Sequence, residues 1–185
     1  MTERDIESVW LEVQRRAAAA WVRHDFPAAL DEVDKFLQKP LPGELRGYAL
    51  AFRASIRESA GHSQGALDDY RAAYSLASKP SYRRYTVEIC LGNISEKSGR
   101  PDEAVNWYRA AIETSLEAEG VASGTALSRY LRIRDEHTLS KEERDLCNEA
   151  VRRSWNLLEM QGDLDLGSLS EVAERLVRAQ GEARG

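Results

Sequence analysis

The sequence predicts an all-α protein, an α-solenoid of stacked antiparallel helical hairpins. Strand signals are nearly absent from its 185 residues, because no run alternates apolar and polar residues over several β-branched positions. Apolar and small residues instead recur at intervals of three and four, which places them on one face of a helix. Residues 101–116 show this pattern with Ala104, Tyr108, Ala111 and Ile112.

A regular period is the second observation that predicts the solenoid. The small residue at the centre of three helical segments recurs, at an almost constant spacing, as Ala29, Ala66 and Ala104. Each segment is preceded by another helical stretch and a short turn, so the repeated unit is a helical hairpin. A hairpin of two amphipathic helices cannot cover its own apolar face, and stacking copies side by side buries it.

Three hairpins are expected from the periodicity and the breaks between them: residues 5–39, 43–79 and 81–118. In the first, Asp25 precedes the second helix, and the sequence Pro-Leu-Pro-Gly at 40–43 ends the hairpin. In the second, Ser63 is an N-cap residue by type and position. In the third, Pro101 suits the first helical turn, because its missing N–H would have no intrahelical partner there.

The pattern loosens beyond Gly120, where a fourth, degenerate hairpin is expected over residues 121–161. Ser140 and Glu143 have the spacing of a capping box and open its long second helix. A final helix at about 168–181 closes the solenoid by covering the last apolar face. Together these elements make one helical domain over residues 1–185.

The third hairpin resembles a tetratricopeptide repeat (TPR), and the motif residues are Leu91-Gly92-Asn93, Gly99-Arg100, Glu103-Ala104, Trp107-Tyr108 and Ala110-Ala111. The other two hairpins are similar to it with departures. Arg53 stands where the family usually has an apolar residue, and His24 replaces the usual turn glycine. The resemblance covers roughly residues 8 to 118, and the spacing of the copies is longer than the usual period of ~34.

Composition excludes several classes of protein. The 26 basic and 31 acidic residues leave a net charge of −5, which argues against nucleic acid as the main partner. The longest apolar run, 17–22, is far shorter than the ~20 residues of a membrane span, and no secretory segment is visible. Cys90 and Cys147 have no metal-ligand spacing and are interpreted as buried small side chains in a reducing cytoplasm.

Motifs for catalysis or cofactor binding are absent from the sequence. There is no HExxH, no GxSxG elbow and no phosphate-cradling GxxxxGK[ST]. His24 and His62 fall in inter-helix turns, and His137 in the Asp-Glu-His-Thr loop, where solvated side chains are expected. The chain is therefore expected to be non-enzymatic, with no cofactor and no metal.

The TPR resemblance implies a concave groove lined by the first helix of each hairpin. The candidate groove residues are Tyr48, Phe52, Ser55 and Glu58 in the second hairpin, and Thr86, Ile89, Cys90, Asn93, Glu96 and Lys97 in the third. Asn93 stands where many peptide-binding members hold the ligand backbone, although it could equally bond within its own repeat. Ser55 and Ala18 occupy the matching positions in the other copies, so the set of side chains with which some members hold a C-terminal carboxylate is incomplete.

A basic patch is a further candidate surface. It would comprise Arg129, Arg132 and Arg134 with Arg152-Arg153, together with Arg83-Arg84, and would suit an acidic protein segment or nucleic acid. The alternative is a solvated helix face with acidic partners on the same helix, such as Glu136 near Arg132.

These observations favour a cytoplasmic, non-catalytic adaptor or scaffold that binds a protein or peptide segment in the groove. The partner is expected to be another protein or peptide, with a second copy of the chain conceivable and a membrane excluded. Two alternatives stay open: an inhibitor or immunity-type protein that neutralises a toxin or enzyme by capping it, and a regulatory module that responds to a peptide.

Overall fold

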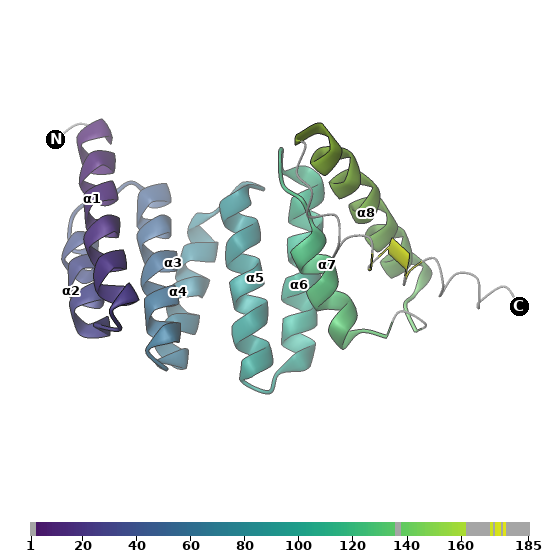
Figure 1. Cartoon of the computed structure of the whole chain (residues 1–185), viewed down its shortest axis with the longest axis horizontal. Coiled ribbons are helices and arrows are strands. Elements are labelled where there is room, and N and C mark those ends of the chain that lie inside the picture. Colours follow the sequence, from purple (N-terminus) through teal and green to yellow (C-terminus); the bar gives the residue numbers. More distant parts are fainter. Residues whose placement is uncertain (1–2, 136–137, 162–170, 172, 175, 177–185) are drawn as a thin grey trace, which may run out of the picture. The chain divides into compact units, whose positions relative to one another are not determined.

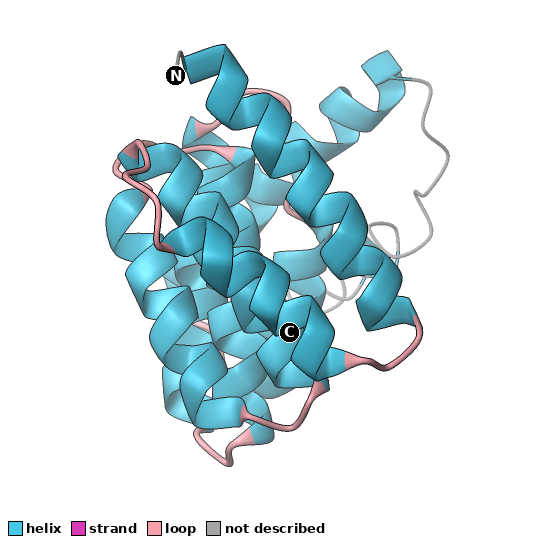
Figure 2. Ribbon diagram, turned by 90° about the vertical axis from the view of Figure 1, so that its left-hand side faces the viewer, coloured by secondary structure: helices cyan, strands magenta, loops and turns pink. Residues whose placement is uncertain are grey.

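The computed structural model describes residues 3–135, 138–161, 171, 173, 174 and 176. These residues contain helices and connecting loops and no strand (Figure 2). They divide into two compact units, unit 1 (Met1–Ser78) and unit 2 (Lys79–Gly185). The all-α class expected from the sequence is therefore confirmed for the described part of the chain.

Unit 1 contains two helical hairpins (Figure 1). Its helices are α1 (Glu3–Val22), α2 (Phe26–Leu37), α3 (Gly43–Ser59) and α4 (Ser63–Leu76). Each packs against the next in sequence, α1 on α2, α2 on α3 and α3 on α4. Because the connections are short, successive helices run antiparallel.

Unit 2 contains α5 (Tyr82–Lys97), α6 (Pro101–Glu117), α7 (Gly124–Ile133) and α8 (Lys141–Gln161). Helix α5 pairs with α6, while α7 and α8 pack on each other and both contact α6. Most of the expected closing helix at 168–181, and His137, lie outside the described residues. Leu176, which is described, is buried with the apolar residues of α6, α7 and α8.

The predicted register of the small residues is visible in the core. Ala29, Ala66 and Ala104 are each completely buried, one in the second helix of each of the first three hairpins. A methyl group at this position lets the two helices of a hairpin approach closely. The period seen in the sequence thus corresponds to a repeated packing contact.

The turns inside these hairpins repeat at the same period. His24, Gly61 and Gly99 all have positive φ, of 60°, 81° and 71°. The next residue closes each turn: the N–H groups of Asp25, His62 and Arg100 donate to the carbonyls of Ala20, Arg57 and Ser95. This six-to-one bond after a left-handed residue is the Schellman C-cap. His24 is therefore a non-glycine residue in the conformation that glycine adopts in the other two copies.

The capping box predicted from Ser140 and Glu143 is present at the start of α8. The Glu143 N–H donates to Ser140 Oγ (3.2 Å), and the Ser140 N–H donates to Glu143 Oε2 (2.8 Å). Burial alone would raise the pKa of Glu143, but these bonds, the Tyr130 hydroxyl and the Arg134 guanidinium lower it to about 2. The reciprocal bonds cap the start of α8, and the bonds from Tyr130 of α7 and from Arg134 just after it hold Glu143 against the preceding helix.

The two cysteines differ in burial. Both are free thiols; Cys147 is completely buried and Cys90 is half-buried. Burial raises the pKa of the Cys147 thiol to about 12, so the thiol stays protonated and packs as an apolar group. Cys90 is less enclosed than the sequence interpretation supposed.

We expect His24→Gly to raise the free energy of unfolding by about 0.5–1 kcal/mol, because glycine relieves the left-handed strain at that position. Urea unfolding followed by circular dichroism measures the change. The matched variant Gly99→Ala should lower stability by about 1 kcal/mol. A Cβ there meets nothing within 4 Å, so its effect is confined to the backbone. A less stable His24→Gly protein would mean that the ring contact of His24 with Phe26 outweighs the strain.

Candidate functional site

The candidate groove residues of unit 1 have different surroundings along α3. Tyr48 is 48% exposed and lines a small pocket with Glu7 of α1 and the start of α3. Phe52, one turn further on, is half-buried. Its ring lies 5.8 Å, centroid to centroid, from both Trp10 and Trp21 of α1, in edge-on geometry. Phe52 therefore packs α3 against α1. Its removal would lower the stability of unit 1 as well as change the surface beside it.

Ser55 and Glu58, further along α3, are held by a tyrosine of the second helix. The Tyr70 hydroxyl donates to Glu58 Oε2 (3.2 Å) and lies 3.1 Å from Ser55 Oγ. The ring of Tyr70 is 2% exposed, so its hydroxyl brings a polar end to the edge of an otherwise buried side chain. Both candidate residues thus have a partner within their own hairpin.

Unit 2 repeats this arrangement between α6 and α5. The Tyr108 hydroxyl lies 2.9 Å from Asn93 Oδ1 and 3.0 Å from Glu96 Oε2, and it donates its single proton to these two acceptors. The ring of Tyr108 is completely buried and fills the space above Gly92, where an added Cβ would overlap it. The oxygen of Asn93 therefore bonds within its own repeat, the second of the two roles that the sequence left open.

Burial raises the pKa of Tyr108, and the bond to Glu96 raises it further, to about 12. The carboxylate prefers the protonated phenol as a donor, and the positive charges of Arg129 and Arg132 act in the opposite direction. Tyr108 is thus neutral at ordinary pH, and its hydroxyl donates a hydrogen bond to the Glu96 carboxylate. Tyr108, Glu96 and the two arginines are close enough to influence one another electrostatically.

The other candidates on α5 divide between surface and core. Thr86 is exposed and its hydroxyl donates to the Tyr82 carbonyl within the helix (2.8 Å). Ile89 is 9% exposed and belongs to the apolar core of unit 2, so it offers little surface to a partner. Lys97, at the end of α5, is exposed.

Asn93, Glu96 and Lys97 of α5 line one pocket together with Arg129 and Arg132 of α7. The pocket has a volume of about 280 Å³. It brings together predicted groove residues and two of the predicted basic-patch residues. The sequence treated these as separate surfaces, because residues far apart in the chain and on different helices share no local pattern.

The three arginines of the predicted patch do not all face this pocket. Arg132 Nη2 donates to both oxygens of Glu96, at 2.6 Å each. Arg134 instead donates to Glu143 of α8 (3.0 Å). Arg152 pairs with Glu149 and Arg153 donates to the Ala118 carbonyl, so both are engaged elsewhere. The basic group of the pocket is accordingly Arg129, Arg132 and Lys97, and Glu136 lies outside the described residues.

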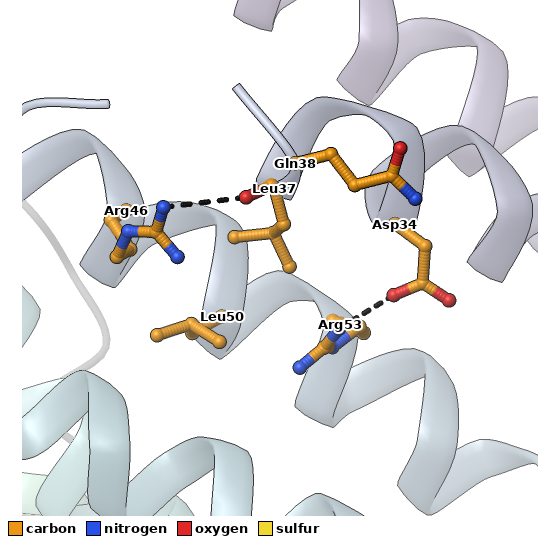
Figure 3. A pocket seen from close by; sticks show the side chains of 6 residues that line it. All are labelled: Asp34, Leu37, Gln38, Arg46, Leu50 and Arg53. Carbon is orange, nitrogen blue, oxygen red and sulfur yellow. Dashed lines mark hydrogen bonds and ion pairs between the residues drawn. The ribbon is translucent and has the colours of Figure 1, made fainter. Parts of the chain in front are cut away.

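A further pocket lies between α2 and α3 of unit 1 (Figure 3). It has a volume of about 400 Å³ and is lined by Asp34, Leu37, Gln38, Arg46, Leu50 and Arg53. The Arg46 guanidinium donates to the Leu37 carbonyl (3.3 Å) and the Lys39 carbonyl (3.4 Å), which covers the end of α2. This arginine therefore acts as a helix C-cap.

Arg53, the departure from the TPR pattern, is the centre of an ion network in that pocket. It donates through Nε and Nη2 to the two oxygens of Asp69 (2.8 and 2.7 Å) and through Nη1 to Asp34. Arg57 also donates to Asp69 (2.8 Å), whose side chain is 6% exposed. Because a buried carboxylate needs such donors, Arg53 and Asp69 stabilise the fold together.

In the described part of the chain, no group of three or more histidine, cysteine or acidic side chains could hold a metal ion. Among the same residues, no helix is long and apolar enough to cross a membrane.

No protein-family model matches the sequence, and no curated protein matches it. Solved structures are similar in fold. BtubC (BKLC) from P. vanneervenii has a TM-score of 0.53 at 16% identity, covering 99% of this chain and 91% of that one. Two structures of MamA have TM-scores of 0.54 and 0.57 at 18% and 13% identity; they cover 86% and 95% of this chain, and 86% and 94% of their own. The chain thus has the fold of a TPR-like helical repeat protein.

We expect Asp69→Asn to lower the free energy of unfolding by about 2–4 kcal/mol, because Arg53 and Arg57 would lose the carboxylate they share. Urea unfolding measures the loss. The neighbouring Asp68→Asn is the matched control: Asp68 is exposed and, among the described residues, accepts only from Gln64 (2.9 Å). Its effect should stay within about 0.5 kcal/mol. Equal losses in the two variants would contradict a structural role for the network.

We expect the stability of the protein to fall between pH 10 and 12 in part because of Tyr108. The unfolded chain loses the phenol proton near pH 10, whereas the folded protein keeps it up to a pKa of about 12. The contribution is complete below pH 10 and is lost as pH rises, by about 2–3 kcal/mol in all. Unfolding free energies at several alkaline pH values should show a shallower decline for Tyr108→Phe. Identical declines would refute this assignment.

Proposed function

We propose that the chain is a non-catalytic adaptor or scaffold that binds a segment of another protein along the first helices of its hairpins. The pocket formed by α5 and α7 carries the proposal. It combines the cationic side chains Lys97, Arg129 and Arg132 with the carboxamide of Asn93. Guanidinium groups stay protonated in proteins, which suits charge-assisted binding better than proton transfer.

The hydrogen bonding of Asn93 in this pocket supports the proposal. Asn93 Oδ1 accepts from Tyr108, while the amide nitrogen donates to no residue that the structure describes. That nitrogen is suited to a backbone carbonyl of a bound segment. Because Tyr108 fixes the orientation of the side chain, less conformational entropy is lost on binding.

The fold supports the same reading. TPR-like hairpins offer extended surfaces on their first helices, and such surfaces accept peptide segments or partner helices. A cytoplasmic setting is proposed from the two free thiols, Cys90 and Cys147. The partner is proposed to carry an acidic group, because among the described lining residues of the pocket the cationic side chains outnumber the carboxylate of Glu96.

We expect Arg129→Gln to weaken partner binding roughly tenfold or more, because it removes a charge from the pocket. The protein is used to capture its partner from an extract of the native cell, and the affinity of the identified segment is then measured by calorimetry. Arg152→Gln is the matched control, since it removes the same charge from an exposed pair with Glu149. The proposal is wrong if both variants bind the segment as tightly as the unsubstituted protein.

A further inference from the structure

Glu96 occupies an unusual place in the pocket of α5 and α7, because among the described residues that line the pocket it is the one carboxylate beside three cationic side chains. Arg132 Nη2 lies 2.6 Å from each of its oxygens. The Tyr108 hydroxyl donates to one of them from below (3.0 Å). The carboxylate thus sits where an anionic group of a ligand would sit.

Glu96 pairs with Arg132 but not with Arg129, the other arginine that lines the pocket. Arg129 makes no hydrogen bond or ion pair with any residue in the described ranges, although it is half-buried and close enough to influence Tyr108. Lys97 lines the same pocket and is exposed. A half-buried guanidinium in this position favours a further anion, since an unpaired buried charge is costly.

The contact between Glu96 and Arg132 is exchangeable. The Arg132 side chain is 52% exposed and that of Glu96 is 31% exposed. An ion pair with this exposure contributes little net stability, so an incoming anion can replace it at small cost. The pocket volume of about 280 Å³ also leaves room for a carboxylate or phosphate group, compared with ~30 Å³ for one water molecule.

We propose that this pocket binds oxyanions and that the Glu96 carboxylate fills it in the free protein. Glu96 thereby competes with the acidic group of the partner for Arg132. The proposal rests on the proposed function, because it names the chemistry that the same pocket takes: a carboxylate or phosphate group of a bound protein segment. In the free protein, the Glu96 carboxylate accepts a hydrogen bond from Arg132. When the ligand binds, its oxygens accept from Arg132 and Arg129, and Glu96 keeps its bond to Tyr108.

This competition lowers the affinity of the pocket for any anion. An intramolecular carboxylate has a high effective concentration, and the ligand gains only the difference between its own contact and the one it replaces. A neutral side chain of the same shape at position 96 would still accept from Tyr108 but would bind Arg132 more weakly. Glu96→Gln is therefore expected to increase anion affinity.

The test uses the full chain, with inorganic phosphate and acetate as probes at constant ionic strength. Nitrogen-15 NMR of the arginine Nε–H groups reports binding at Arg129 and Arg132. We expect Glu96→Gln to bind the probe roughly fivefold more tightly than the unsubstituted protein. Arg132→Gln should lose most of the binding. Glu58→Gln is the matched control, since Glu58 accepts from Tyr70 in the equivalent position of unit 1, and it should bind as the unsubstituted protein does.

The outcomes separate the inference from the function on which it rests. Response to phosphate alone assigns a phosphorylated segment, and response to acetate shows that the pocket accepts a carboxylate. Equal affinities of the folded Glu96→Gln and unsubstituted proteins would overturn the competition by Glu96. The proposed function would still stand if Arg129→Gln then weakened partner capture. Absence of probe binding in every variant would overturn the oxyanion site itself.

Discussion

A tyrosine that crosses from the second helix to the first fixes both the packing and the polar surface of two hairpins. Tyr70 and Tyr108 bury their rings against the preceding helix, and each hydroxyl bonds an acidic side chain at the edge of that helix. The ring requires a small neighbour, which is Gly92 in unit 2. The hydroxyl requires an acceptor, which makes Glu58 and Glu96 part of the packing as well as of the surface.

The two arginine-containing pockets differ in how fully their charges are matched. Arg53 in unit 1 directs its N–H groups at two aspartates, and Arg46 caps the end of α2. Those guanidiniums are already used by the fold, so their pocket has little left to offer a ligand. In the pocket of α5 and α7 the cationic side chains outnumber the carboxylate among the residues that the structure describes, which is why the binding site is proposed there.

Periodicity predicted the helices, because burial of one face leaves a repeated signal in the sequence. It predicted the buried register of Ala29 and Ala104 in the same way. The TPR resemblance singled out His24 as the residue in place of the usual turn glycine, and the structure shows its positive φ. It did not predict that Phe52 packs between two tryptophans of another helix or that Arg132 reaches Glu96. The position of a residue on a helix face predicts the direction of its side chain. The residue that this side chain contacts lies far away along the chain, and no local sequence pattern predicts it.

Glu96 has two roles that oppose each other. The hydroxyl of a buried tyrosine needs an acceptor, so replacing Glu96 with an apolar residue would leave Tyr108 with one acceptor fewer and destabilise α5 against α6. The same carboxylate lies within reach of Arg132 and weakens the attraction of the pocket for other anions. Stability of the hairpin therefore sets a limit on the affinity of the pocket. A ligand must offer a stronger or additional contact, and Arg129 is the group in the pocket with which that contact can be made.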